Sequence, residues 1–391
     1  MNKRFKYKKV TAVSIGHLFN DIFAAFLSPV IPVLTEKLGI TVSMAGFLDI
    51  IRNAPSILNP FIAFFVEKLR AKYIVIFMPA VTSISMSLLG IATNYAVLVI
   101  LILTAGISST LFHIPAPVMI KNYSGTKTGR GMSYYMLGGE LSRTLGPLVI
   151  TGAITLWGFE GTWRLVPFGI IASTILYFLL RGHSEPDYKP AAKEKLKRFP
   201  EIKQISPHLI FIGLFLIFFM GLKVLSTLYL TAFMVNRGQT LMAASLRLSI
   251  LQLSGAAGTL LAGHLSDIIG KKATMLVSAV FSPLLLFAFQ FAGPAGQFPI
   301  LIGLGFVLFA PGPVYLAIIQ DADADSPSFA NGLYMTIQFA IRAGIVFLSG
   351  MAIDKIGFDR TYVIAIIAGL GTIPVVLFFP NRRVFKSIKN D

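Results

Sequence analysis

The sequence predicts an all-α membrane protein of about twelve transmembrane helices, arranged as two six-helix bundles that are related by pseudo-symmetry. Three observations indicate this fold. Only 13% of the 391 residues are charged, about half the proportion of a soluble domain. Apolar runs such as residues 209–222, 273–291 and 363–379 contain almost no charge and approach the ~20 residues that cross a bilayer. Short motifs of the first half also recur in the second half.

The first apolar segment, residues 10–34, predicts a membrane span rather than a cleaved signal peptide. It is longer than the apolar part of a signal peptide, and it contains Asn20 and Asp21. Like the later runs, it is continuously apolar rather than alternating, which is typical of a helix that satisfies its own backbone hydrogen bonds in lipid.

The net charge of +17 reflects membrane topology rather than nucleic-acid binding. Breaks in hydropathy place the spans near residues 22, 53, 83, 107, 142, 172, 220, 253, 282, 307, 342 and 370. Most of the 34 Lys and Arg residues then fall at the termini and in the even-numbered loops. Because cytoplasmic loops carry an excess of Lys and Arg, we expect both termini in the cytoplasm.

Internal repetition defines the predicted domains. Gly158-Phe-x-x-Thr-Trp163 recurs 199 residues later as Gly357-Phe-x-x-Thr-Tyr362. We therefore predict an amino-terminal bundle over residues 1–181 and a carboxy-terminal bundle over residues 208–391. Residues 182–207, which are rich in Lys, Glu and Pro, are expected to form a cytoplasmic linker. An even number of spans in each half gives both repeats the same orientation in the membrane.

The prolines of two corresponding spans predict matching kinks. Pro115 and Pro117 in the first half correspond to Pro311 and Pro313 in the second. Proline removes a backbone donor and interrupts the hydrogen-bond ladder of a helix, so we expect both spans to bend there.

The loop after the eighth predicted span carries the most specific motif in the chain. It resembles the signature G-x-L-x-D-x-x-G-[RK]-[RK] of the major facilitator superfamily, with Gly263, Asp267, Gly270, Lys271 and Lys272 at the defined positions. Glycine permits close helix approach, aspartate caps a helix end, and lysine suits anionic headgroups and helix carboxyl ends. The resemblance implies that these five residues gate the cytoplasmic side of a small-molecule transporter.

Three further segments resemble the fosmidomycin-resistance branch of that superfamily, which exports small drugs. They are His17-x-x-Asn20-Asp21, Phe112-His113 with its neighbouring prolines, and Gly138-Gly139…Leu145-Gly146-Pro147. The last segment also resembles the Gly-Pro motif of proton-coupled drug antiporters. Glu140 and Arg143 depart from the neutral residues expected in that stretch, so the resemblance does not settle the substrate.

Ionisable residues inside the spans are the main functional candidates, because a charge at bilayer depth is costly unless it is paired or hydrated. His17, Asn20 and Asp21 have the spacing i, i+3, i+4 and so share one helix face. We predict proton coupling at Asp21, Glu140 and His113. The residues predicted to contact substrate are His17, Asn20, Arg52, Asn53, Arg143, Lys223, Arg247 and Arg342.

The balance of charge inside the spans favours an anionic or zwitterionic substrate. The permanent cations inside the spans outnumber the three acids, which are Asp21, Asp49 and Glu140. Positive charge therefore remains even if every acid is paired with a cation. Two acids also have a structural alternative, because Glu140 could be held by Arg143, and Asp49 by Arg52. His113 suits either a proton relay or helix packing.

Metal and cofactor chemistry is not expected. The chain contains no cysteine, which excludes disulfides and thiolate ligands. Alternating Asp321, Asp323 and Asp325 resemble the start of a calcium loop, but Ser326 replaces its required glycine and Gly332 its final glutamate.

We therefore predict a monomeric secondary transporter that moves a small amphipathic or anionic solute by alternating access, through proton-coupled efflux. Its partners are the solute, protons and the lipid bilayer, with no nucleic acid. A nutrient symporter or uniporter of the same fold is the closest alternative. A lipid translocator or a membrane sensor is the alternative from another class. An enzyme is not expected, since no nucleophile elbow, metal-ligand cluster or phosphate loop is present.

Overall fold

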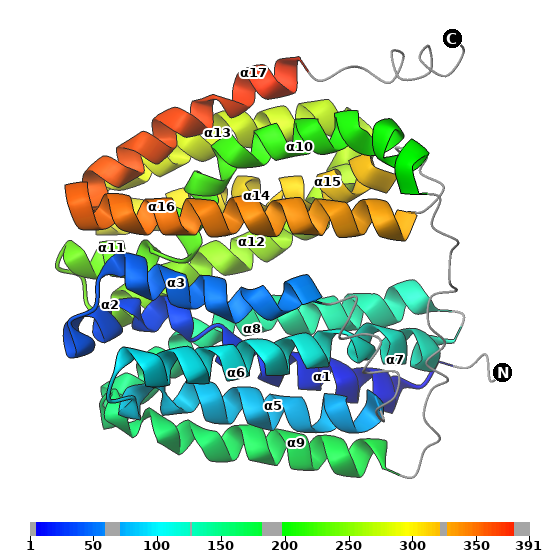
Figure 1. The fold of residues 1–391 in the computed structure, drawn as a ribbon, viewed down its shortest axis with the longest axis vertical. Coiled ribbons are helices and arrows are strands. Elements are labelled where there is room, and N and C mark those ends of the chain that lie inside the picture. Colours follow the sequence, from blue (N-terminus) through cyan, green and yellow to red (C-terminus); the bar gives the residue numbers. More distant parts are fainter. Residues whose placement is uncertain (1–4, 59–70, 126, 182–197, 321–326, 379–391) are drawn as a thin grey trace. The chain divides into compact units, whose positions relative to one another are not determined.

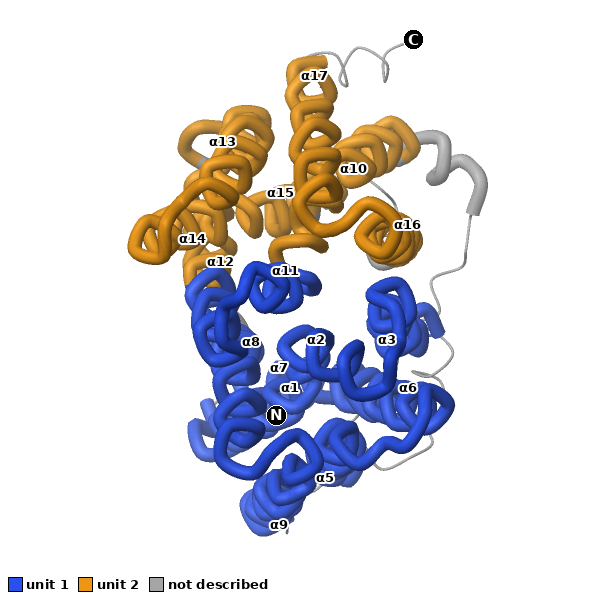
Figure 2. The backbone as a smooth tube through the Cα atoms, turned by 90° about the vertical axis from the view of Figure 1, so that its left-hand side faces the viewer, with its two compact units in different colours: residues 1–193, 228–253 blue, residues 194–227, 254–391 orange. Residues whose placement is uncertain are grey.

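The computed structural model describes residues 5–58, 71–125, 127–181, 198–320 and 327–378, and its regular elements in these ranges are all helices (Figure 1). The chain forms two compact units (Figure 2). Unit 1 comprises residues 1–193 and 228–253, and unit 2 comprises residues 194–227 and 254–391. The predicted boundaries at residues 181 and 208 stay predictions. Residues 182–197 of the predicted linker lie outside the described residues, and a helix begins at Arg198.

Helix α1 (Tyr7–Ala24) is the central element of unit 1 and packs against α5, α6, α7, α8 and α9. The helices of unit 1 that surround it or follow it in the chain are α2 (Leu27–Leu38), α3 (Val42–Asn53), η1 (Ala54–Leu58), α5 (Ala71–Ser87), η2 (Leu88–Ile91), α6 (Tyr95–His113), α7 (Pro115–Ser124), α8 (Thr128–Trp157), η3 (Glu160–Leu165), α9 (Val166–Leu180) and α11 (Leu230–Asn236). Ser14, His17 and Asn20 of α1 are buried, so these polar side chains face protein rather than lipid.

Side-chain caps define where two helices of unit 1 begin. The Thr41 hydroxyl accepts a hydrogen bond from the Met44 amide at the start of α3. The Asn94 side chain accepts one from the Val97 amide at the start of α6. Such caps satisfy backbone donors that a helix amino terminus leaves open.

Glycines allow α8 to lie directly against α1. A Cβ atom added at Gly138 would lie 2.5 Å from the Ser14 carbonyl oxygen, and one at Gly146 would lie 2.6 Å from the Ala25 Cβ atom. Any larger residue would therefore separate the two helices. This close approach places α8 side chains beside the polar face of α1.

Unit 2 is built around contacts of α10 with α16 and of α13 with α14, α16 and α17. Its elements are α10 (Arg198–Thr227), α13 (Lys271–Phe291), α14 (Pro294–Phe309), α15 (Pro311–Gln320), α16 (Pro327–Leu370) and α17 (Thr372–Leu377). Helix α12 (Leu241–Ile269) belongs to unit 1 through Leu253 and to unit 2 from Ser254.

The predicted repeat and kinks are visible in the backbone. Gly158 has φ 72° and ψ 168°, and Gly357, 199 residues later, has φ 81° and ψ 170°. A second pair at the same offset, Gly39 and Gly238, also has positive φ. Helix α6 ends just before Pro115 and α14 ends just before Pro311, which confirms the prediction that these prolines interrupt corresponding spans.

Within the described residues, nine helical segments are long and apolar enough to cross a membrane. One of them, Leu333–Leu377, has 45 residues and is interrupted at Gly357, whose backbone is not helical and divides it into two helical parts. Their summed helical length of about 67 Å is enough to cross a ~30 Å hydrocarbon core twice. The all-α membrane fold is confirmed. The count of twelve is not directly confirmed, because the second predicted span runs into residues 59–70, outside the described ranges.

Candidate functional site

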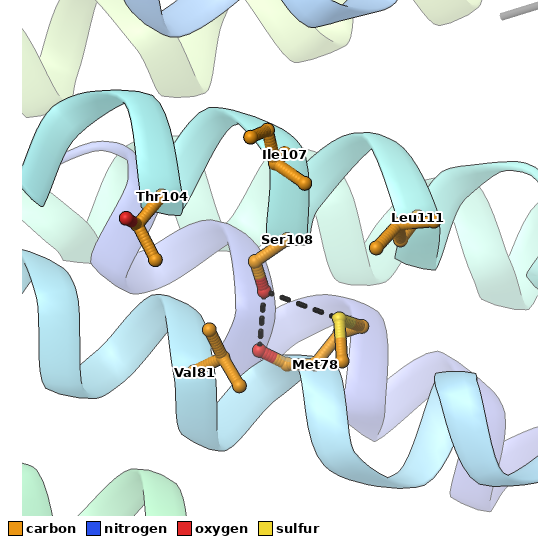
Figure 3. A pocket seen from close by; sticks show the side chains of 6 residues that line it. All are labelled: Met78, Val81, Thr104, Ile107, Ser108 and Leu111. Carbon is orange, nitrogen blue, oxygen red and sulfur yellow. Dashed lines mark hydrogen bonds between the residues drawn. The ribbon is translucent and has the colours of Figure 1, made fainter. Parts of the chain in front are cut away.

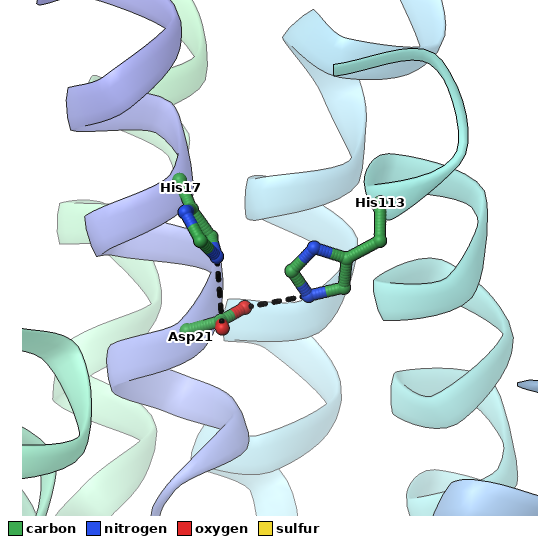
Figure 4. Close-up of side chains that lie close together, drawn as sticks. All are labelled: His17, Asp21 and His113. Carbon is green, nitrogen blue, oxygen red and sulfur yellow. Dashed lines mark ion pairs between the residues drawn. The ribbon is translucent and has the colours of Figure 1, made fainter. Parts of the chain in front are cut away.

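A buried carboxylate between two imidazoles forms the centre of the candidate site (Figure 4). On α1, the Nε2 atom of His17 lies 3.2 Å from the Oδ2 atom of Asp21. On α6, the Nε2 atom of His113 lies 3.1 Å from the Oδ1 atom of Asp21. The side chains of His17 and Asp21 are only 7% and 16% exposed. We call these three residues the histidine–aspartate triad.

Tyr135 of α8 contacts both histidines of the triad. Its backbone carbonyl oxygen lies 2.7 Å from the Nδ1 atom of His17, and its ring stacks on the His17 ring with centroids 4.0 Å apart. Its hydroxyl group lies 3.1 Å from the Nδ1 atom of His113. One residue of α8 therefore orients the imidazoles of two other helices.

A chain of polar side chains extends from the triad toward α5. The Asn20 amide donates to the Oδ1 atom of Asp21 at 2.9 Å, and its carbonyl accepts from the Thr82 hydroxyl at 2.9 Å. Thr82 in turn lies 2.8 Å from the hydroxyl of Ser108. Asn20 and Thr82 are completely buried, so these hydrogen bonds satisfy groups that water does not reach.

Two Arg–carboxylate pairs lie on α8 and α3 of unit 1. Glu140 and Arg143 of α8 approach to 3.3 Å, and the Arg143 side chain is 42% exposed while that of Glu140 is 11% exposed. Asp49 and Arg52 of α3 approach to 3.0 Å, and Arg52 also donates to the Ala24 carbonyl at 3.1 Å. Both predicted pairs exist. The roles predicted for Glu140, Arg143 and Arg52 in coupling and binding stay predictions.

The remaining predicted substrate residues are Asn53, Arg247, Lys223 and Arg342. Asn53 donates to the Asp49 carbonyl at 2.7 Å. Arg247 of α12 is buried in unit 1 and donates to the Ala243 carbonyl at 3.0 Å. Lys223 and Arg342 belong to unit 2, where the Lys223 ammonium lies 4.6 Å from the centre of the Phe309 ring. Their predicted contact with substrate stays a prediction.

The predicted gating loop contains two lysines that bind helix carbonyls. Lys271 donates to the Ala317 carbonyl of α15 at 2.7 Å, and Lys272 donates to the Leu377 carbonyl of α17 at 2.6 Å. Both acceptors lie in the last turns of their helices, where cations are stabilised. Gly270 has φ 90°, and a Cβ atom at Gly263 would meet no atom within 4 Å. The side chain of Asp267 lies outside the described residues.

A pocket of about 200 Å³ lies between α5 and α6 (Figure 3). It is lined by Met78, Val81, Thr104, Ile107, Ser108 and Leu111. None of these six side chains is charged, so the pocket does not match the anionic or zwitterionic solute that the sequence favours.

The triad also has the composition of a metal site. The ligand atoms of His17, Asp21 and His113 lie within 4.8 Å of one another. Two imidazoles and a carboxylate are ordinary ligands of transition metals. The expectation of no metal therefore stays a prediction, and the alternating aspartates of residues 321–325 lie outside the described residues.

Sequence reasoning did not identify Tyr135, Thr82 or Ser108. Tyr135 precedes Gly139 by four residues and Arg143 by eight, so all three share one face of α8. That shared helix face was the sequence signal that could have identified Tyr135. The backbone contact of Tyr135 with His17 has no signature in the side-chain pattern.

Comparison with known proteins gives a consistent result. The family model described as Major Facilitator Superfamily matches residues 13–346. The fosmidomycin resistance protein of Escherichia coli (strain K12) is 22% identical over 377 residues, covering 95% of this chain and 92% of that protein. The uncharacterized MFS-type transporter YfnC of Bacillus subtilis (strain 168) is 24% identical over 382 residues, covering 95% and 93%.

Solved structures share the fold at low sequence identity. The crystal structure of a D-xylose-proton symporter is 16% identical, with a TM-score of 0.72, and the match covers 96% of this chain and 97% of that chain. The crystal structure of the nucleoside transporter NupG is 15% identical, with a TM-score of 0.69 and complete coverage of both chains. The family resemblance predicted from residues 263–272 is thereby confirmed.

Proposed function

The chain belongs to the major facilitator superfamily, and we propose that it exports a small anionic or amphipathic solute in exchange for protons. It is an integral membrane transporter and not an enzyme. The proposal adds a coupling ion, a direction and a substrate class to that family assignment.

The histidine–aspartate triad is the observation that supports proton coupling. A carboxylate that is 16% exposed inside a helical bundle is expensive unless its charge is balanced. The two imidazoles, at 3.1 Å and 3.2 Å, can stabilise that charge by donating hydrogen bonds, and an imidazole can also hold a proton. A group that binds a proton in one access state and releases it in the other converts a pH gradient into transport.

Arg143 supports the anionic substrate class. In the ion pair of Arg143 with Glu140, the Arg143 side chain is the more exposed partner. Both residues belong to α8, the helix that contacts the triad. Arginine binds carboxylate and phosphate-like groups through paired hydrogen bonds. An incoming anion would compete with Glu140 for Arg143, which links solute binding to a neighbour of the proton site.

The direction of transport is proposed from the relatives. The fosmidomycin resistance protein covers nearly the whole chain at 22% identity, and resistance is what an exporter confers. We place the protein in a bacterial inner membrane as a monomer, with both termini cytoplasmic. The contacts of Lys271 and Lys272 with helix carboxyl ends suit a loop that holds one access state closed.

Transport by reconstituted protein tests the proposal. Proteoliposomes loaded with fosmidomycin should release it faster when a pH gradient drives protons inward through the transporter. Dissipating the gradient with a protonophore should reduce release to the rate of passive exchange. Release that is unchanged without the gradient would refute proton coupling. If fosmidomycin instead accumulates in the proteoliposomes together with protons, the protein is a symporter and not an exporter.

A further inference from the structure

The hydrogen bonds of His17 require one more proton than a neutral imidazole carries. Its Nδ1 atom lies 2.7 Å from a backbone carbonyl oxygen, and a carbonyl can only accept, so Nδ1 carries a hydrogen. In a neutral ring the Nε2 atom then has no hydrogen. Yet Nε2 lies 3.2 Å from Asp21 Oδ2. Two lone pairs at that distance repel, and a proton shared between these atoms removes the repulsion.

His113 satisfies its contacts without an additional proton. Its Nε2 atom can donate to Asp21 Oδ1 at 3.1 Å, while its Nδ1 atom accepts from the Tyr135 hydroxyl at 3.1 Å. Tyr135 is 5% exposed, and no other hydrogen-bond partner of its hydroxyl is found among the described residues. A buried hydroxyl needs an acceptor, and the bare Nδ1 of a neutral His113 provides one.

We propose that the coupled proton is shared between His17 Nε2 and Asp21 Oδ2, and that His113 is a neutral donor that positions the carboxylate. This inference rests on the proposed function and names the atoms that hold the proton. On loading, a proton enters between neutral His17 and ionised Asp21. On release, His17 and Asp21 together lose one proton, while the hydrogen on His113 Nε2 stays in place.

The charged and titratable groups around this contact come from two helices. Helix α6 contributes His113, and α8 contributes Tyr135 together with the Glu140–Arg143 pair. Lys72 of α5 and Tyr123 of α7 lie near Lys9 instead. Lys9 is eight residues from His17, about 12 Å along α1.

Tyr135 links this proton site to the position of α8. Movement of α8 away from α1 would break the carbonyl contact with His17 and the hydroxyl contact with His113 together. Without the carbonyl, His17 can carry its single hydrogen on Nε2 and donate to an ionised Asp21. The extra proton is then no longer required, so helix movement and proton release are coupled.

A matched pair of variants separates the two histidines. In His17→Asn, the amide nitrogen stands near the former Nδ1 position and can still donate to the Tyr135 carbonyl, but the proton-sharing nitrogen is lost. In His113→Gln, the amide nitrogen stands near the former Nε2 position and can still donate to Asp21, but the ring can no longer titrate. Each variant keeps the structural hydrogen bond of its histidine.

Fosmidomycin release from proteoliposomes gives the first readout. His17→Asn should lower gradient-driven fosmidomycin release about 100-fold, the scale of a lost proton-transfer group. His113→Gln should retain much more driven release than His17→Asn, because a neutral donor replaces a neutral donor at Asp21. If His113→Gln loses driven release while His17→Asn keeps it, or if both variants lose it, the assignment of the proton to His17 and Asp21 is overturned. If Asp21→Asn also keeps full driven release, the proposed proton coupling itself fails.

A spectroscopic readout on the full chain in nanodiscs needs no substrate. The ¹⁵N spectrum of histidine-labelled protein should show one protonated ring nitrogen on His113 at neutral pH. His17 should show a hydrogen on Nδ1 and a strongly hydrogen-bonded Nε2 that is perturbed in Asp21→Asn. Signals are assigned from the two histidine variants. Two protonated nitrogens on His113, with a bare Nε2 on His17, would overturn the proposal.

Discussion

Replacement of Gly139 by alanine should displace the His17 ring without removing any functional group. A Cβ atom at residue 139 would lie 2.6 Å from the Cε1 atom and 2.9 Å from the Nε2 atom of His17. Ordinary contact begins at 3.4 Å, so the ring must move by about 0.8 Å away from α8. The distance from Nδ1 to the Tyr135 carbonyl would grow from 2.7 Å to roughly 3.5 Å, beyond a hydrogen bond.

The Gly139→Ala change should lower the stability of the protein only modestly, but it should slow transport strongly. Overpacking costs about 1–3 kcal/mol, and the lost hydrogen bond about 1 kcal/mol, against a gain of up to about 1 kcal/mol in helix propensity. We expect the free energy of unfolding of Gly139→Ala to be about 1–3 kcal/mol lower than that of wild type. A displacement near 1 Å at a reacting group lowers rates by about 100-fold, so driven fosmidomycin release should fall accordingly.

Gly152→Ala is the matched control on the same helix. A Cβ atom at Gly152 would meet no atom within 4 Å, so this variant should transport as wild type and be equally or more stable. Thermal unfolding and proteoliposome release measure both variants. If Gly139→Ala transports at the wild-type rate, the position of the His17 ring does not matter, and the reasoning is refuted.

Three further predictions follow from other parts of the molecule. Arg143→Gln should raise the KM for fosmidomycin about 10- to 100-fold, since a charge-assisted hydrogen bond contributes about 1.5–3 kcal/mol; an unchanged KM would remove Arg143 from the binding site. Gly158→Ala and Gly357→Ala should each destabilise the protein by about 1–3 kcal/mol, because only glycine readily adopts φ near 72–81° with ψ near 170°. Gly344→Ala, where a Cβ meets open space, is their control, and equal melting temperatures for all three would contradict the strain argument. Tyr135→Phe should let His113 Nδ1 take up a proton, visible as a second protonated nitrogen by ¹⁵N NMR; an unaltered spectrum would show that the hydroxyl does not set its tautomer.

Local spacing predicted part of the candidate site. His17 and Asp21 are four residues apart, so a helix alone brings them together, and the structure has them in contact. The same argument found the Glu140–Arg143 and Asp49–Arg52 pairs. These interactions depend on helix geometry and on no neighbouring element.

Contacts between helices were not predictable in the same way. His113 reaches Asp21 only because α6 packs beside α1, and no spacing along the chain encodes that. Tyr135 contacts His17 through its backbone, which every residue possesses. Likewise, the recurrence of Gly158 and Gly357 was visible because several flanking residues recur, whereas immediately around Gly39 and Gly238 the recurring neighbours reduce to Thr41 and Thr240.

Proton movement caused by the solute tests the central claim most directly. Proteoliposomes that contain a pH-sensitive dye should report a proton flux when fosmidomycin is added to wild-type protein. Asp21→Asn should abolish this flux while the variant still binds fosmidomycin, because the amide cannot take up the proton that the triad holds. A proton flux of wild-type size in Asp21→Asn would contradict the account.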